Sequence, residues 1–228
     1  MKASNPAKVY KSVEDVDFHA FGEDSVQILL DRQSGQDKLT TWNLVDSQAK
    51  GGVKIWKGQV QGSSWSPFKV SRHINADKAT IQHALIDPDL LLKMDDMTSS
   101  VRILKSVDEE GKLTLRQLAT RAIFPVSARE FVIVTYATTL PDGRMIIASR
   151  SLPLEGVQLT DGAVRGITVI SGYIIEEVKS ASGKPCCDVT LLAHADLAGY
   201  IPSKIVNLLG TSTTVKILAN LQTVVERM

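Results

Sequence analysis

The spacing of apolar residues along the chain alternates between a helical period and a strand period. Apolar residues between positions 13 and 21 recur at helical spacing, and Ser12 with Asp15 is suited to cap the start of this helix. A second short helix is predicted from Asp24 to Arg32. Three strands follow, separated by turns that contain glycine and serine, and they are Thr41–Gln48, Val53–Val60 and Phe68–Ile74.

The middle of the chain predicts two short helices and then a long series of strands. Asp77 caps a helix that runs to Ile86, and Pro88 begins another that ends at Leu92. The strands are joined by turns rich in glycine and acidic residues, and they are Ser99–Val107, Lys112–Ile123, Phe131–Leu140, Arg144–Leu152, Val164–Val178 and Cys187–Ala195. A long helix from Pro202 to about Arg227 completes the pattern, which predicts an α+β fold.

Two predicted strands are apolar at consecutive positions, Phe131–Val134 and Ile167–Ile170, so both faces of the sheet are expected to be covered. The last helix carries one stripe of apolar or small residues, which are Val206, Gly210, Thr213, Ile217 and Leu221. A sheet closed by this stripe encloses either a packed core or a cavity, and periodicity alone leaves both open. If the interior is hollow, leucine at position 210 is expected to occupy ligand space and to change stability little.

Composition limits the classes of function. The chain has 26 Lys and Arg against 25 Asp and Glu, a net charge of +1, which provides no field to hold it on nucleic acid. No apolar run approaches the roughly 20 residues of a membrane span, and no signal peptide is recognised. The adjacent Cys186 and Cys187 are interpreted as free thiols in a reducing compartment. A cytoplasmic protein is therefore expected.

Motifs for covalent chemistry are not found in the sequence. The serine contexts at Gly62–Ser64 and Ile170–Gly172 lack the pattern of a nucleophile elbow, and Lys50–Gly52 is too short for a phosphate-binding loop. His194 and Asp196 form the one near pair of potential metal ligands, whereas a zinc site needs three or four. We therefore expect no catalytic residues, no cofactor and no metal.

Several short motifs resemble, in order, those of one known family. Phe124–Phe131 places proline, serine, arginine, an acid and an aromatic residue before an apolar strand, and Ala195–Pro202 contains the pattern Asp-Leu-x-Gly-x-x-Pro before the last helix. Val164–Gly166 and Met97–Ser99 resemble the starts of two further strands. From about Thr41 to the C-terminus, the chain thus resembles the START family of StAR-related lipid-transfer domains.

The resemblance implies a helix-grip fold, in which a curved antiparallel β-sheet wraps around a long C-terminal α-helix and leaves an internal lipid tunnel. It implies that residues 1–40 are an N-terminal helical segment of the domain and that residues 41–228 are a START-like lipid-binding domain. The implied function is to bind a single lipid in a hydrophobic cavity and to transfer it between membranes through the cytosol, as a monomer with transient peripheral membrane contact. A lipid-sensing regulatory module is the alternative, and an enzyme that uses the cavity ranks last.

Departures from the family bear on the ligand. The residues Leu90–Met94 lack the headgroup arginine of phosphatidylcholine-binding members, so the ligand is expected to be a sterol or another lipid. Arg116 and Thr135 occupy the positions at which cholesterol-binding members carry an acid and an arginine. Arg116 either faces the tunnel, where it needs an anionic or hydroxyl partner, or lies on the outer surface. The helix stripe, with Arg116 and Thr135, makes up the predicted lipid contacts.

The loop before Phe131 is the expected gate of the tunnel, together with the last helix. Its apolar residues Phe124 and Val126, beside Ile123, are expected to touch the membrane and to couple docking to opening. Arg129 and Glu130 either read a lipid headgroup or hold the loop to the fold through hydrogen bonds and an ion pair.

Overall fold

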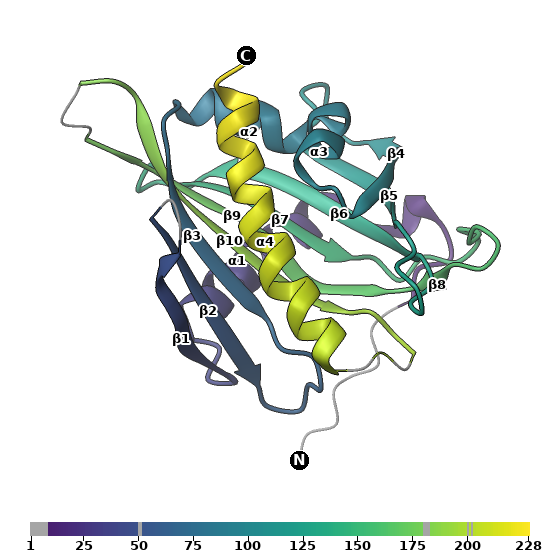
Figure 1. Cartoon of the computed structure of the whole chain (residues 1–228). Helices are drawn as coiled ribbons and strands as arrows, with labels where there is room; N and C mark the ends of the chain where they lie inside the picture. The colour runs from purple at the N-terminus through teal and green to yellow at the C-terminus, as the bar shows by residue number, and fades with distance from the viewer. Residues whose placement is uncertain (1–8, 50–51, 180–182, 200, 202) are drawn as a thin grey trace.

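The computed structural model describes residues 9–49, 52–179, 183–199, 201 and 203–228, with the side chains at 46–49 and 203–209 outside this description. It confirms the predicted α+β class. A curved ten-stranded sheet carries the long helix α4 (Ser203–Val225) across one face, as Figure 1 shows in yellow. The predicted first residue of this helix, Pro202, lies outside the described residues.

The strands follow the predicted order closely, and they are β1 (Thr40–Ala49), β2 (Val53–Val60), β3 (Phe68–Ile74), β4 (Thr98–Ser106), β5 (Leu113–Thr120), β6 (Arg129–Thr139), β7 (Met145–Ser151), β8 (Val164–Arg165), β9 (Ile167–Val178) and β10 (Cys186–Asp196). Their order in the sheet is β1-β2-β3-β10-β9-β7-β6-β5-β4, with antiparallel neighbours. The short β8 pairs in parallel with β6.

Two predicted strands are longer than the observed ones. The strand predicted to end at Ile123 stops at Thr120, and the strand predicted from Val164 is divided at Gly166. A side chain at position 166 would run into the ring of Phe131, so the chain crosses this ring only because the residue is glycine.

The predicted pair of N-terminal helices is wrong, because residues 18–34 form one helix. This helix, α1 (Phe18–Ser34), is capped by Asp17, whose carboxylate accepts a hydrogen bond from the Ala20 N–H at 3.0 Å. The earlier capping pattern at Ser12 produces only a short 3-10 turn, η1 (Val13–Asp15). Hydrogen bonding to the helix N-terminus thus selects Asp17 over Ser12 as the start of the helix.

Helices cover both faces of the sheet. On the face that carries α4, the short helices α2 (Lys78–Ile86) and α3 (Pro88–Met94) pack beside it, and Asp77 and Asp87 cap them as their N-cap residues. On the opposite face, α1 packs against β6, β7 and β9. Along β6, Val132 and Val134 therefore contact the apolar cluster under the N-terminal segment. Phe131, Ile133 and Thr135, which alternate with them, face the side of the sheet that carries α4.

Among the residues that the structure describes, no helix combines the length and the apolar character needed to cross a membrane.

Candidate ligand cavity

The space between α4 and the sheet is only partly filled. A cavity of about 360 Å³ lies there, between strands β5 to β7, β9 and β10, the middle of α4, and loop residues around positions 65 and 121–128. Most of its lining side chains are apolar, and they include Trp65, Phe68, Leu85, Leu91, Met94, Leu118, Ile123, Val126, Phe131, Ile133, Ile147 and Leu191. The interior is thus a cavity beside the middle of α4 and a packed core beside its C-terminal part.

The predicted stripe of α4 divides between these two regions. Gly210, Thr213 and Ile217 line the cavity. Leu221 is fully buried in the packed core with Leu218 and does not line the cavity, so a ligand in this space would not touch it. The side chain of Val206 lies outside the described residues.

Gly210 does not face the open part of the cavity. A side chain at this position would run into the ring of Phe68, a buried residue of β3. The expectation that leucine at 210 would enter empty ligand space is therefore wrong. Periodicity placed Gly210 correctly on the inner face of the helix, but it could not show that an aromatic ring fills the space in front of it.

Arg116 of β5 faces the cavity, and its exposed fraction is only 3%. Its Nε donates a hydrogen bond to Thr114 Oγ1 at 2.7 Å. Among the described residues, no carboxylate lies within 4.0 Å of its guanidinium group. Burial lowers the pKa of Arg116 to about 10, and the negative charge of Asp87 opposes this shift. Arg116 therefore stays charged at neutral pH, and the alternative of an outer-surface arginine is wrong.

A row of hydroxyl groups crosses the sheet beside Arg116. Thr114 of β5 pairs with Thr135 of β6, Thr135 pairs with Ser149 of β7, and Ser149 pairs with Ser171 of β9. The hydroxyls of Thr135 and Ser149 are hydrogen-bonded at 2.9 Å. The last three of these residues line the cavity, so its sheet wall offers a continuous row of hydroxyl groups.

Several cavity residues were not among the predicted contacts. Ser149, Ser171 and Tyr173 line the cavity, and Ser171 and Tyr173 are two apart on β9 and thus share one face. Burial raises the pKa of the Tyr173 hydroxyl, helped by the negative charge of Asp95. The period-two spacing of these polar residues within an apolar strand is the signal that would have identified them.

Arg129 anchors two loops to each other. Its guanidinium donates to Ser127 O at 2.6 Å, to Leu197 O at 2.9 Å and to Ala198 O at 3.2 Å. Burial lowers the pKa of Arg129, but these carbonyls occupy its donors. The interpretation of Arg129 as a loop anchor therefore fits the structure better than a headgroup contact, although the residue also lines the cavity.

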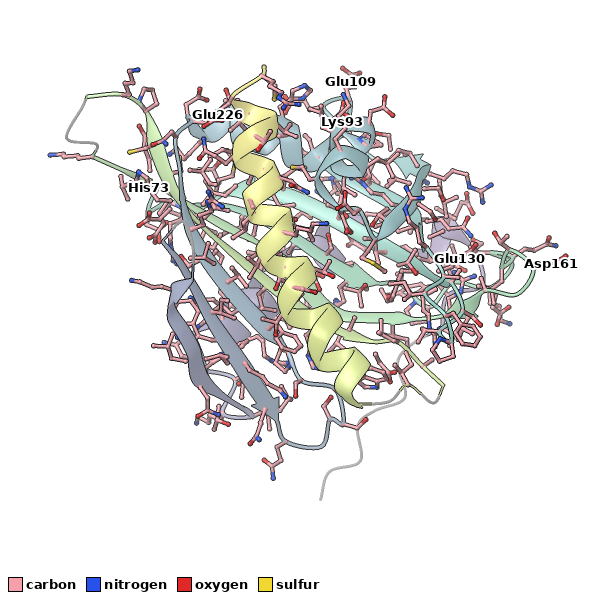
Figure 2. All side chains as sticks on the ribbon, viewed as in Figure 1. His73, Lys93, Glu109, Glu130, Asp161 and Glu226 are labelled. Carbon is pink, nitrogen blue, oxygen red and sulfur yellow. The ribbon has the colours of Figure 1, made fainter. Side chains whose placement is uncertain are left out.

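Glu130 lies on the other face of β6. The predicted ion pair of the loop is not found for Arg129 or Glu130 among the described residues. Its carboxylate accepts hydrogen bonds from Gln117 Nε2 at 2.9 Å and from the Thr160 N–H at 3.2 Å. Burial alone would raise the pKa of Glu130, but these hydrogen bonds outweigh it and hold the pKa below the usual range. Figure 2 shows Glu130 beside the loop that carries Asp161, away from α4, so Glu130 supports that loop and not the cavity.

The loop at residues 121–128 closes on itself at one end of the cavity. The N–H and C=O groups of Ile123 and Val126 are hydrogen-bonded to each other, at 2.9 and 2.6 Å, and both side chains line the cavity. Between them, Phe124 projects outward with an exposed fraction of 97%. An exposed aromatic residue is thus held directly beside the cavity.

A buried histidine connects the outer helix to the cavity loop at Trp65. Because an arginine only donates, His194 Nδ1 accepts from Arg32 Nη1 at 2.6 Å, and His194 Nε2 then donates to Trp65 O at 3.0 Å. Arg32 in turn forms an ion pair with Asp37 at 2.5 Å. Burial and the charge of Arg32 lower the pKa of His194 to about 4, so the imidazole is neutral at neutral pH.

Comparison with solved structures gives the same fold. Human StAR-related lipid transfer protein 5 is 18% identical, with a TM-score of 0.78 over 92% of this chain and 97% of that one. A StAR-related lipid transfer protein from Xanthomonas axonopodis is 24% identical, with a TM-score of 0.66 over 81% of this chain and 98% of that one. The lipid transfer and protein localization domain of human StarD13 is 20% identical, with a TM-score of 0.69 over 88% and 97% of the two chains.

No curated protein matches the sequence. A family model does, and it is that of the START domain, over residues 26–227. The match covers most of the chain, including α4 and every strand that borders the cavity. The predicted resemblance and the helix-grip architecture are therefore confirmed, and the chain belongs to the START domain family.

Proposed function

We propose that the protein binds a single lipid in the cavity under α4 and carries it between membranes through the cytosol, as a monomer and without chemical change. The observation that supports this most directly is the cavity itself, because it is lined mainly by apolar side chains and lies inside a START domain. A lipid chain that leaves a bilayer for water loses about 0.8 kcal/mol per CH₂ group. An apolar cavity removes most of this penalty during transfer.

The size of the cavity favours a small lipid. At about 360 Å³, it lies near the lower end of the range of roughly 300–1,000 Å³ that is usual for small-molecule sites. A lipid with one acyl chain or a compact ring system suits this space better than a lipid with two long chains. The proposal that phosphatidylcholine is not the ligand is consistent with this size.

Exchange of the lipid requires an opening, and the structure offers one at the loop 121–128. Arg129 binds the carbonyls of Ser127 on one side and of Leu197 and Ala198 on the other. It thereby joins the loop 121–128 to the segment that leads into α4. We infer that these two segments move together, since releasing the Arg129 hydrogen bonds frees both at once.

The first prediction concerns transfer and the place of the ligand. Vesicle assays with fluorescent sterols, fatty acids and single-chain phospholipids are expected to show accelerated transfer of at least one lipid. Thr213→Phe should abolish this transfer, because Thr213 lines the cavity and a ring there occupies ligand space. Thr223→Phe is the matched control, since Thr223 is exposed on the same helix.

Transfer by Thr213→Phe at the wild-type rate would place the ligand elsewhere. Stable lipid binding without any transfer would instead favour the sensing module, and turnover of the bound lipid would favour an enzyme. Folded protein that binds none of these lipids would exclude the carrier.

The second prediction concerns membrane contact. Burial of one phenylalanine side chain is worth about 1.5–3 kcal/mol, so Phe124→Ser should weaken binding to vesicles by roughly tenfold or more. Protein stability should not change, because Phe124 is 97% exposed. Leu44→Ser is the control, since Leu44 is 54% exposed on β1 at the far side of the sheet. Equal losses in both variants, measured by vesicle co-flotation, would show that the loop 121–128 has no special part in docking.

A further inference from the structure

Arg116 is a buried cation that forms no ion pair among the described residues. Its Nε donates a hydrogen bond to Thr114 Oγ1. No hydrogen bond is found from its two terminal nitrogens to a described residue. These nitrogens belong to a side chain that lines the cavity. A ligand in the cavity can therefore approach this side chain.

Two acidic groups, one whose charge acts on Arg116 and one in the cavity wall, have other hydrogen-bond partners. Asp87, whose charge acts on Arg116, accepts from the N–H groups of Asp89 and Leu90 at the start of α3. Asp95, in the cavity wall, accepts from the Met97 N–H and from Thr98 Oγ1. Each carboxylate thus stabilises a local turn. Neither lies within ion-pair distance of Arg116 among the described residues.

The chemistry of the guanidinium group decides what kind of lipid suits this position. It presents donors only, in a planar fork that matches a carboxylate or a phosphate through two parallel hydrogen bonds. A neutral hydroxyl accepts one of these bonds and leaves the charge uncompensated in an apolar cavity. A compact anion accepts both hydrogen bonds and compensates the positive charge of the guanidinium group.

The hydroxyl row provides the second part of the site. Thr135 lies on β6, next to β5, and Ser149 lies on β7, the following strand of the sheet, and both line the same cavity. Their hydroxyls are in contact with each other, so one of the two has a proton to donate to a third group. An anion bound to Arg116 has more lone pairs than one guanidinium can use, and this hydroxyl pair is suited to take another.

We propose that the cavity selects lipids whose polar end is a compact anion, a carboxylate or a phosphate monoester, with the anion on Arg116 and the hydrocarbon along the apolar helix and loop wall. This inference rests on the proposed lipid-binding function and names the class of its ligand. It distinguishes the protein from a carrier of neutral sterols, for which an unpaired arginine in the cavity is a disadvantage.

The test compares lipids that differ only at the polar end. Binding of hexadecanoate, hexadecyl phosphate, methyl hexadecanoate and hexadecanol to the whole chain is measured by calorimetry below their micelle concentrations, with cholesterol as a neutral ring lipid. Both anions are expected to bind at least tenfold more tightly than the ester and the alcohol. The ratio of the two anions identifies which headgroup the site prefers.

Variants at position 116 assign the selectivity to one side chain. Arg116→Leu should bind hexadecanoate and its methyl ester equally well, and Arg116→Lys should keep part of the preference. Arg102→Leu is the control, because Arg102 is exposed on the neighbouring strand β4 and donates to Gln117. The wild-type comparison does not depend on whether any variant folds.

The outcomes separate this inference from the function on which it rests. Equal affinity of the wild type for the acid and the ester, or tighter binding of cholesterol than of either anion, would overturn the anion preference and leave the carrier intact. Preference for anions that survives in Arg116→Leu would also overturn it. Failure of every lipid to bind would contradict the proposed function itself.

Discussion

Lowering the pH from 7 to 5 is expected to cost the protein about 2 kcal/mol of its free energy of unfolding through His194 alone. Its pKa is about 4 in the folded protein, against an ordinary value of 6.5. Between these values the unfolded chain binds the proton and the folded protein does not. The contribution of neutral His194 to the free energy of unfolding is therefore fully present above pH 6.5 and decreases as the pH falls. Below pH 4 the total loss of this contribution is roughly 3 kcal/mol.

The physical reasons are the burial of His194 and, after it, the position of Arg32. A protonated imidazole cannot accept the hydrogen bond from Arg32 Nη1, and the two positive groups would then face each other in a site where His194 is 1% exposed. Asp37, which pairs with Arg32, and Asp196 only partly offset this repulsion. Protonation thus weakens the connection between α1, β10 and the loop at Trp65.

Urea unfolding at pH 7 and pH 5 measures the effect. His194→Gln keeps an acceptor and a donor but does not titrate, so its stability should fall by about 2 kcal/mol less than that of the wild type over this interval. His83→Gln, at an exposed position of α2, should behave as the wild type does. If the wild type and His194→Gln lose the same amount, then His194 is not the titrating group.

Replacing Gly210 with leucine is expected to destabilise the protein by about 1–3 kcal/mol, because the new side chain meets the ring of Phe68. Phe68 is 5% exposed and lines the cavity, so a ring displaced into the cavity takes up ligand space. The same substitution should therefore also reduce lipid uptake. Thermal unfolding and lipid binding, measured on one preparation, report the two effects.

A double-mutant cycle tests the assignment to Phe68. In the background of Phe68→Ala the cost of Gly210→Leu should largely disappear, because the ring is no longer in the way. Thr213→Leu, three residues along the same helix and lining the open cavity, should leave stability nearly unchanged. A Gly210→Leu protein as stable as the wild type would show that Phe68 moves freely.

The sequence was sufficient to predict the order of elements after the N-terminal helix, the fold class and the inner face of α4, because each follows from local spacing and from short motifs. It could not orient Arg116. On β5, Leu113 and Leu115 are buried under the N-terminal segment while Thr114 and Arg116 are buried toward α4. In a strand that is buried on both faces, apolar and polar residues do not alternate, so the sequence does not show which side chains face the cavity.

The hydroxyl row and the contact of Gly210 with Phe68 depend on the pairing of distant strands. Thr135, Ser149 and Ser171 become neighbours only through the register of β6, β7 and β9. Phe68 reaches Gly210 because β3 pairs with β10 under α4. Local patterns carry no information on such registers, since a shift by one residue reverses every side chain.

The pairing of β3 with β10 also has a consequence for how the chain folds. Residues 68–74 find their partners in residues 187–193, and β1 and β2 join the rest of the sheet only through β3. During synthesis the edge of β3 that pairs with β10 therefore stays unpaired until β10 has been synthesised. Contacts so distant in sequence slow folding, and they make the closing of this ladder a late step at which aggregation competes with assembly.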